Sequence, residues 1–315
     1  MSDQVNSIPL PASGNNARFG EFPTWILLSA IYGGWFIVTW NFAILPWWVA
    51  LPTGAWFVAW HNSFQHEALH GHPSRHAWLN DLLAWPPLCL WIPYPVYRDS
   101  HRAHHQTPSL TDPFDDPESW YLPRAQWEQA GTFNRAILVF NNTLVGRVTI
   151  GPWLAAGVLW KGQLLSILSG DRRYSGIWLL HLALCGLMLT WLWLVCAISP
   201  LDYVLMFAWP GLSLSLIRSF YEHRPSQNQD GRTVIVDAGF PMSLLFLNNN
   251  LHMVHHDRPN IPWFALPMIY RRHRDDILRR AGDFYFPGGY LEIARRFALR
   301  PKDRPVHEIC PRYSR

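Results

Sequence analysis

Four stretches of the chain are long and apolar enough to cross a membrane as helices. They cover about residues 23–45, 47–65, 176–198 and 203–222, and about 20 apolar residues span the hydrocarbon core. Short turns without Lys or Arg join the first pair and the second pair, so each pair is predicted to form a hairpin. The pattern therefore predicts an all-α integral membrane protein with four transmembrane helices in two hairpins.

The other apolar stretches are interrupted too often to be spans. Residues 79–97 contain four prolines, which remove backbone donors and break helices, so we interpret them as an interfacial or re-entrant segment. Residues 133–160 include Asn, Arg, Gly and Pro and fit a helix lying in the membrane surface. Residues 107–124 are polar and acidic and are predicted to form a solvated loop.

These patterns divide the chain into three parts. Residues 1–22 form a polar N-terminal tail that does not resemble a cleaved signal peptide. Residues 23–270 form the membrane domain, with interfacial helices and a helical cap on the cytoplasmic side. Residues 271–315 form a basic cytoplasmic C-terminal segment.

Composition supports a membrane protein. Charged residues make up 15% of the chain and hydrophobic residues 49%, whereas soluble domains usually have about 25% charged residues. The 19 Trp residues fit a protein with two membrane–water interfaces. The four cysteines are scattered and indicate no disulfide framework. We expect no nucleic-acid partner.

The distribution of basic residues predicts the orientation. Of the 26 Lys and Arg residues, nine lie between the second and third spans and fifteen follow the fourth, whereas the hairpin turns contain none. Because basic loops stay on the cytoplasmic side, we expect both termini and the long middle loop there, on a bacterial inner membrane or an equivalent one.

Three histidine boxes supply the candidate chemistry. They read HEALHGH at 66–72, HRAHH at 101–105 and HMVHH at 252–256. Residues three and four apart share one face of a helix, so each box aims two or three imidazoles at one place. Eight histidines, counted without His72, are too many for one tetrahedral zinc ion and enough for two metals. All three boxes are predicted to lie at the cytoplasmic face.

The remaining histidines are weighed one by one. His223 leaves the fourth span on the side where the boxes lie, so we favour it as a ligand over an interfacial residue. His72 would need a break in the helix to join His70, and we interpret it as a structural residue. The same interpretation holds for His76, His181, His273 and His307.

Polar residues beside the boxes are candidates for orienting the imidazoles, because ligating histidines usually donate their second N–H to a carboxylate or carbonyl. The neighbouring carboxylates are Glu67, Asp99, Glu222 and Asp257. A side-chain amide of Asn248, Asn249 or Asn250 could hold a metal-bound water. Arg218 lies near the membrane and either faces a substrate head group or extends to the surface.

With these boxes the chain resembles the membrane fatty acid desaturase–hydroxylase family. HEALH, HRAHH and HMVHH match the family's HxxxH, HxxHH and HxxHH boxes in order, and EHR at 222–224 resembles the segment that supplies a ninth ligand. Some members carry an Asn four residues before that histidine, where this chain has Ser219. The resemblance implies that the metal ligands are His66, His70, His101, His104, His105, His223, His252, His255 and His256.

The resemblance also implies a function. Two iron ions, with O2 as co-substrate, would oxidise an unactivated C–H bond of a fatty acyl chain taken from the membrane, and acyl desaturation is the expected reaction. The same fold could act as a hydroxylase, a carotenoid ketolase or an alkene-forming fatty acid decarboxylase. The chain has no flavin, iron–sulfur or haem motif, so a separate electron donor of the ferredoxin or cytochrome type, with its reductase, is expected.

Two other classes of protein remain possible from the sequence. HEALH matches the HExxH signature of zinc proteases, in which the Glu is the general base, but that reading leaves the two HxxHH boxes unexplained. A metal carrier could use the boxes as a relay. However, transporters usually place ionisable residues within their spans, and the predicted spans of this chain contain few.

Overall fold

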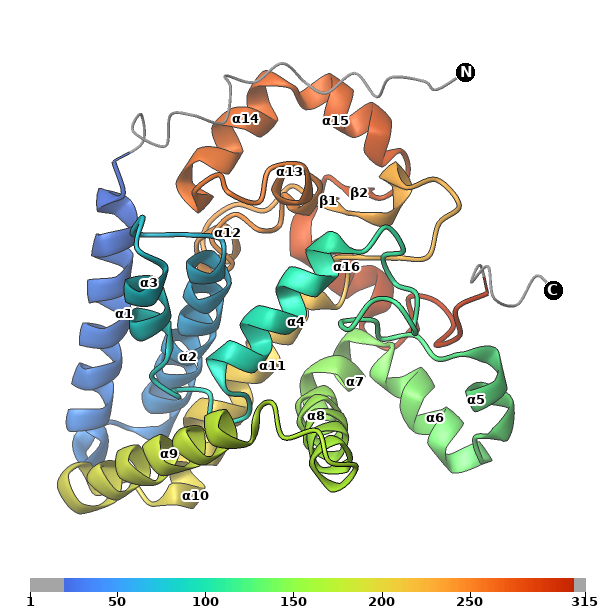
Figure 1. Cartoon of the computed structure of the whole chain (residues 1–315). Coiled ribbons are helices and arrows are strands. Elements are labelled where there is room, and N and C mark those ends of the chain that lie inside the picture. Colours follow the sequence, from blue (N-terminus) through green and yellow to red (C-terminus); the bar gives the residue numbers. More distant parts are fainter. Residues whose placement is uncertain (1–19, 309–315) are drawn as a thin grey trace.

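A computed structural model describes residues 20–308, and it is built mainly of α-helices (Figure 1). The long helices are α1 (Phe22–Trp40), α2 (Trp47–Leu69), α8 (Gly151–Leu168), α9 (Ser175–Cys196) and α11 (Trp209–Ser219). Helix α10 (Pro200–Tyr203) and a π-helical turn at Val204–Ala208 lead directly into α11. The helical architecture predicted from the sequence is therefore confirmed.

Three helices in the described part of the chain are long and apolar enough to cross a membrane. They are Phe22–Trp40, Ser175–Cys196 and the continuous helix Pro200–Ser219. The predicted span at 47–65 belongs to α2, which is 23 residues long but carries polar side chains in its C-terminal half, among them His61, Asn62 and Gln65. Four spans in two hairpins therefore remain a prediction.

Helix α2 lies between α1 and the α10–α11 helix, and small residues allow a close approach. A Cβ atom at Gly211 of α11 would lie 2.5 Å from Cγ1 of Val58, and one at Gly54 of α2 would lie 2.5 Å from Cδ1 of Phe207. Small residues at helix interfaces let backbones pack tightly in membranes. This packing brings the C-terminal ends of α2 and α11 to the same side of the molecule (Figure 1).

The proline-rich stretch at 79–97 is a bent segment and not a crossing helix. Helix α3 (Ala77–Ala84) includes its first residues, α4 (Tyr94–Gln106) begins near its end, and residues 85–93 between the two helices are not helical. The irregular backbone between them is held by its neighbours, because Trp91 donates to the carbonyl of Ala208 and the imidazole of His181 lies 2.8 Å from the carbonyl of Leu90. Irregular backbone at membrane depth is tolerated where protein buries it.

A group of short elements forms a cap beside the ends of α2, α4 and α11 (Figure 1). The cap helices are α12 (Met242–Leu245), α13 (His252–Asp257), α14 (Leu266–Arg272), α15 (Arg274–Ala281) and α16 (Gly289–Phe297). Short 3-10 turns cover Phe42–Ile44, Asp230–Arg232 and Trp263–Ala265. The all-α prediction missed one feature of the cap, a parallel pair of two-residue strands, β1 (Ile235–Val236) and β2 (Tyr285–Phe286).

The segment predicted to lie in the membrane surface consists of three helices at one side of the molecule. These are α6 (Thr132–Asn141), α7 (Leu144–Thr149) and α8, and the short helix α5 (Arg124–Gln129) precedes them. Large apolar side chains of this group are exposed, including Phe133, Trp153 and Leu168. Exposed apolar side chains of this kind fit contact with lipid.

The loop at 107–124 is folded, which corrects the prediction of a solvated loop. Thr111, Asp112, Asp116 and Tyr121 are all buried, at 2 to 6% exposure. Composition alone suggested solvent, but buried carboxylates persist where hydrogen bonds satisfy them. Asp116 accepts from the backbone N–H groups of Thr111 and Glu118.

Candidate metal centre

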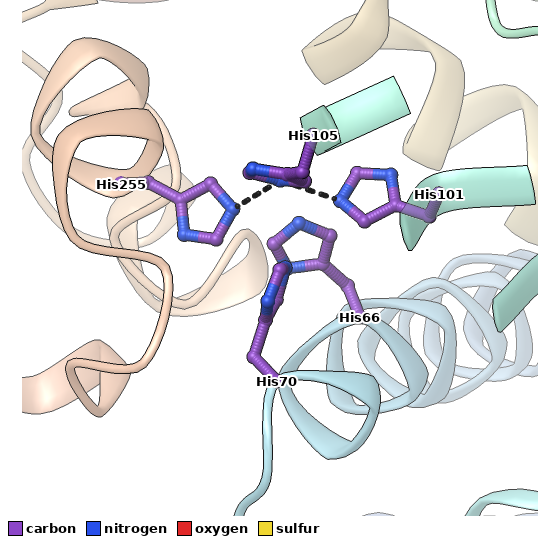
Figure 2. A group of neighbouring side chains, drawn as sticks. All are labelled: His66, His70, His101, His105 and His255. Atoms are coloured by element: carbon purple, nitrogen blue, oxygen red, sulfur yellow. Dashed lines mark hydrogen bonds between the residues drawn. The ribbon is translucent and has the colours of Figure 1, made fainter. Parts of the chain in front are cut away.

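Nine histidines that are far apart in the sequence converge in two groups, each of which could hold a metal ion. The five-histidine group, shown in Figure 2, consists of His66, His70, His101, His105 and His255. The four-histidine group consists of His104, His223, His252 and His256. Within each group one nitrogen of every imidazole lies within 4.8 Å of the others. The structure thus brings together all nine histidines singled out in the sequence.

Helical spacing explains how each box contributes. His66 and His70 lie one turn apart at the end of α2 and enter the same group. In α4, His101 and His105 are four residues apart and point into the five-histidine group, whereas His104 points into the other.

Helix α13 divides its box in the opposite way. His252 and His256 enter the four-histidine group, and His255 enters the five-histidine group. Each HxxHH box therefore contributes to both groups, which ties the two groups together. The last member, His223, lies four residues after the end of α11 and is paired by its backbone with Thr233.

The spacing of the nitrogens fits ligation of one ion by each group. In the five-histidine group, Nε2 of His105 lies 3.0 Å from Nε2 of His101 and 3.1 Å from Nε2 of His255 (Figure 2). In the four-histidine group, Nε2 of His252 lies 3.0 Å from Nε2 of His223. Two nitrogens bound at right angles to one ion, at about 2.1 Å each, would be about 3.0 Å apart.

The second nitrogen of several of these rings has a hydrogen-bond partner of its own. Nδ1 of His104 lies 2.8 Å from a carboxylate oxygen of Asp116, and Nδ1 of His252 lies 3.0 Å from Oδ1 of Asn249. Nδ1 of His223 lies 3.3 Å from the carbonyl oxygen of Arg232. Each Nδ1 must therefore carry a hydrogen, which leaves a lone pair on each Nε2 of a neutral ring. Lone pairs that converge in this way fit a cation bound between them.

The five-histidine group also contains imidazole nitrogens that lack a hydrogen-bond partner. Nε2 of His66 and Nε2 of His70 are buried and have no hydrogen-bond partner. Buried polar atoms are nearly always paired, so these atoms mark a place where a ligand is expected. Nδ1 of His101 lies 3.0 Å from a carboxylate oxygen of Glu118, which leaves its Nε2 free to face the group. The donor set of both groups fits a transition-metal ion.

Burial favours the neutral form of most of these rings. Burial, and to a smaller extent the charge of neighbouring histidines, lowers the pKa of five of these imidazoles well below its usual range. They are His101, His223, His252, His255 and His256. The pKa of His105 is lowered to about 3 by burial and by the nearby histidines. At His104 burial acts in the same direction, but the hydrogen bond to Asp116 and the charge of Glu118 outweigh it, and the pKa is raised. Neutral imidazole is the form that binds metals.

The residues that orient the imidazoles are only partly those suggested by the sequence. Asn249 bonds His252 as described above, and Glu222 lies 3.6 Å from the same Nδ1 while pairing with Arg218. The other three carboxylates bond elsewhere. Glu67 accepts from the backbone N–H of Trp263, Asp99 accepts from Arg98 and Tyr174, and Asp257 accepts from Arg280. Side chains next to a ligand on a helix point about 100° away from it, so sequence neighbours were poor candidates.

Asp116 and Glu118 were missed by the sequence reasoning. They lie in the acidic loop, twelve and seventeen residues after the histidines that they contact. The run DPFDDPE at 112–118 was a possible signal, because carboxylates that follow a histidine box can fold back on it. Asn248 and Asn250 bond to backbone carbonyls of Trp263 and Val236 and do not face the histidines.

The histidines interpreted as structural lie outside both groups. His72 is buried between a carboxylate oxygen of Glu21, at 2.7 Å, and the carbonyl of Asn260, at 3.2 Å. His307 shares a hydrogen bond with Thr111. His76, His181 and His273 are also absent from the two groups. Ser219, where some relatives have Asn, bonds its own helix at Leu216.

Replacing Asp116 with Asn should weaken metal binding without unfolding the protein. The variant keeps the shape of the side chain but loses the charge that holds the Nδ1–H of His104. Loss of such an outer partner typically costs about 10- to 100-fold in metal affinity or activity. Competition with a chelator measures the affinity, and Asp115→Asn, at an exposed carboxylate one residue away, is the matched control. Equal affinities in the two variants would contradict the role given to Asp116.

Comparison with known proteins agrees with this geometry. The sequence matches the model of a family described as fatty acid desaturase over residues 42–289. A search of curated proteins found no match. The matched region contains all nine clustered histidines, and it covers more than half of the chain. The resemblance noted from the histidine boxes is confirmed, and the chain belongs to the fatty acid desaturase family.

Proposed function

We propose that this protein is a membrane di-iron enzyme that uses O2 to oxidise an unactivated C–H bond of a fatty acyl chain, and that its reaction is acyl desaturation. The observation that carries the proposal is the convergence of nine imidazoles in two adjacent groups, in a chain of the fatty acid desaturase family. All-nitrogen ligation suits iron and argues against magnesium or calcium, which prefer oxygen ligands.

The two groups are close enough to act on one substrate. The ring of His105, in the five-histidine group, stacks on the ring of His256, in the four-histidine group, with 4.2 Å between centroids. When bound, two reduced irons would supply, with O2 and external electrons, the oxidant that an unactivated C–H bond requires. In the proposed function the nine histidines hold the two metals, and the groups bonded to Nδ1 fix the orientation of the rings.

The positions of the histidines relative to the helices suggest the route of the proposed acyl substrate. His66 and His70 lie at the C-terminal end of α2, and His223 lies four residues beyond the end of α11. In the proposed function, an acyl chain that enters from the hydrocarbon would reach the groups along these helices. A shift of the chain by about an ångström changes which hydrogen lies next to the metals. Hydroxylation, ketolation of a carotenoid or decarboxylation to an alkene are therefore the alternative reactions of the same site.

The zinc protease reading of HEALH is disfavoured by the contacts of its residues. His66 and His70 share their group with three further histidines, whereas a catalytic zinc has three protein ligands and a water. Glu67, the general base in that reading, accepts a hydrogen bond of 2.9 Å from the backbone of Trp263 and lies 4.0 Å from His72. It is thus committed to a structural role.

Electrons are proposed to come from a separate ferredoxin or cytochrome with its reductase, at the cytoplasmic face. The support for this is the charge bias of the sequence and its lack of a redox cofactor motif. The three apolar helices and the family support a membrane location.

Product analysis by gas chromatography–mass spectrometry tests the proposed reaction. A host that expresses the chain, with a host expressing His104→Ala as the control, is sampled in the lipid extract and in the headspace. A new monounsaturated chain that forms only with the wild type is the expected result, and it gives the position of the double bond. An oxygenated chain, or a volatile alkene one carbon shorter, would replace desaturation by the corresponding alternative.

A further inference from the structure

The acidic loop at 107–124 is held in place by a segment from the far end of the chain, residues 302–307, which we call the C-terminal strap. The backbone N–H of Leu122 donates to the carbonyl of Pro305 at 2.8 Å, and the N–H of His307 donates to the carbonyl of Leu122 at 3.1 Å. Tyr121 donates from its hydroxyl to the carboxylate of Asp303. The loop and the strap therefore form one hydrogen-bonded unit.

The strap is also anchored outside the loop. Lys302 donates from its backbone to the carbonyl of Asn142, at 2.9 Å, and Asn142 returns a side-chain hydrogen bond of 2.9 Å to the carbonyl of Asp303. The ammonium group of Lys302 lies 3.4 Å from the carbonyl of His223. The strap thus connects α6 and α7, the acidic loop and the segment that carries one clustered histidine.

Thr111 is the point where the strap acts on the metal centre. Its φ of +73° is a conformation that β-branched residues rarely adopt. All three of its polar groups are bonded: N–H to Asp116 at 2.8 Å, carbonyl to the hydroxyl of Ser119 at 2.6 Å, and hydroxyl to Nε2 of His307 at 3.0 Å. Strained conformations persist where the surroundings over-determine them, and His307 of the strap is one of those determinants.

The chain of contacts continues from Thr111 to both histidine groups. Asp116, which Thr111 holds, contacts His104 of the four-histidine group. The same carboxylate accepts from the backbone of Glu118, whose side chain contacts His101 of the five-histidine group. One loop therefore supplies an outer carboxylate to each proposed metal, and the strap fixes that loop.

We propose that Thr111 and the C-terminal strap are positioning elements of the metal centre, which set its affinity for iron through Asp116 and Glu118. The strap lies beyond residue 289, where the match to the family ends, so family membership does not assign it this role. The inference rests on the proposed function, because it takes the two groups to be iron sites.

Truncation provides the first test, with iron as the probe. A chain that ends at Glu308 keeps the strap, whereas a chain that ends at Arg300 loses it and retains all nine clustered histidines. We expect the first to bind iron as the full chain does, and the second to show at least a tenfold higher iron dissociation constant, as for loss of an outer partner. Chelator competition measures the constant, and elution as a monodisperse species in detergent shows that each protein is folded.

Point variants test the contact without removing chain. Thr111→Val keeps the β-branched shape and loses the hydroxyl, and His307→Phe keeps a ring and loses the nitrogen. Each should raise the iron dissociation constant about fivefold, which corresponds to one hydrogen bond, and the double variant should be no worse than either. Thr111→Ser, which keeps the hydroxyl but loses the methyl group, should bind iron with most of the wild-type affinity. A role in folding alone would lower thermal stability without this pattern in iron affinity.

The outcomes separate the two proposals. A full-length chain that binds no iron would overturn the proposed function. A full-length chain that binds two irons, together with a chain ending at Arg300 or a Thr111→Val variant of unchanged affinity, would overturn the role of the strap and leave the proposed function standing.

Discussion

Replacing His104 or His255 with Ala is expected to abolish product formation and to lower the iron bound per chain, while the protein still accumulates in the membrane. His104 belongs to the four-histidine group, where its Nε2 lies 3.1 Å from that of His223, and His255 belongs to the five-histidine group. Each substitution removes one ligand from a different group, and C–H oxidation by the proposed mechanism needs both groups loaded.

The control for this prediction is another histidine of the cap. His273 lies outside both groups, between α14 and α15, and His273→Ala should retain activity and iron close to those of the wild type. Full activity in the His104 or His255 variant would contradict the assignment of two metals. An inactive, iron-depleted His273 variant would show that the assignment of the nine ligands is wrong.

Removal of the metal is expected to have an equally large effect on the purified protein. Dialysis against a chelator under reducing conditions should eliminate activity, because the amino-acid side chains of the site offer no group that can oxidise an unactivated C–H bond. Reloading with Fe(II) should restore activity, and reloading with Zn(II) should not, since zinc has no redox chemistry.

The test requires a competent electron supply, so the assay contains an added ferredoxin or cytochrome with its reductase. The matched control is protein carried through the same dialysis without chelator. Recovery of activity with Zn(II), or activity that survives complete removal of metal, would exclude iron as the catalytic metal.

The eight clustered histidines of the three boxes could be predicted because their geometry is local, whereas His223 was favoured only from its place at the end of the fourth predicted span. Spacings of three and four residues on α4 and α13 decide which rings share a face, and the recurrence of one pattern in distant segments indicated a common site. What the spacing did not predict is that each HxxHH box divides its members between the two groups. That division depends on how α2, α4 and α13 approach one another.

The supporting carboxylates could not be predicted in the same way. Asp116 and Glu118 reach the histidines because the acidic loop folds back, and its conformation depends on a strained Thr111 and on His307, 196 residues away. The polar composition of this loop predicted that it is exposed to solvent, but long-range hydrogen bonds hold it against the rest of the protein. Similarly, the pairing of β1 with β2 joins residues about 50 positions apart, and two-residue strands leave no periodic signal in a sequence.

The membrane helices show a limit of hydropathy. Three of the four predicted spans correspond to helices of sufficient length and apolar character. The remaining one, at 47–65, forms the first part of α2, which extends to Leu69 and also carries His66. Because α2 carries both apolar residues and candidate ligands, its composition is mixed, and its apolar content alone does not decide whether it crosses a membrane.

The most direct test of the central claim is the metal content of the purified full-length protein, measured by inductively coupled plasma mass spectrometry after expression in iron-supplemented medium. Two groups of buried imidazoles predict about two iron ions per chain, and loss of most of that iron in the His104→Ala variant. One zinc ion per chain and no iron would contradict the di-iron account and would favour the zinc protease reading of HEALH.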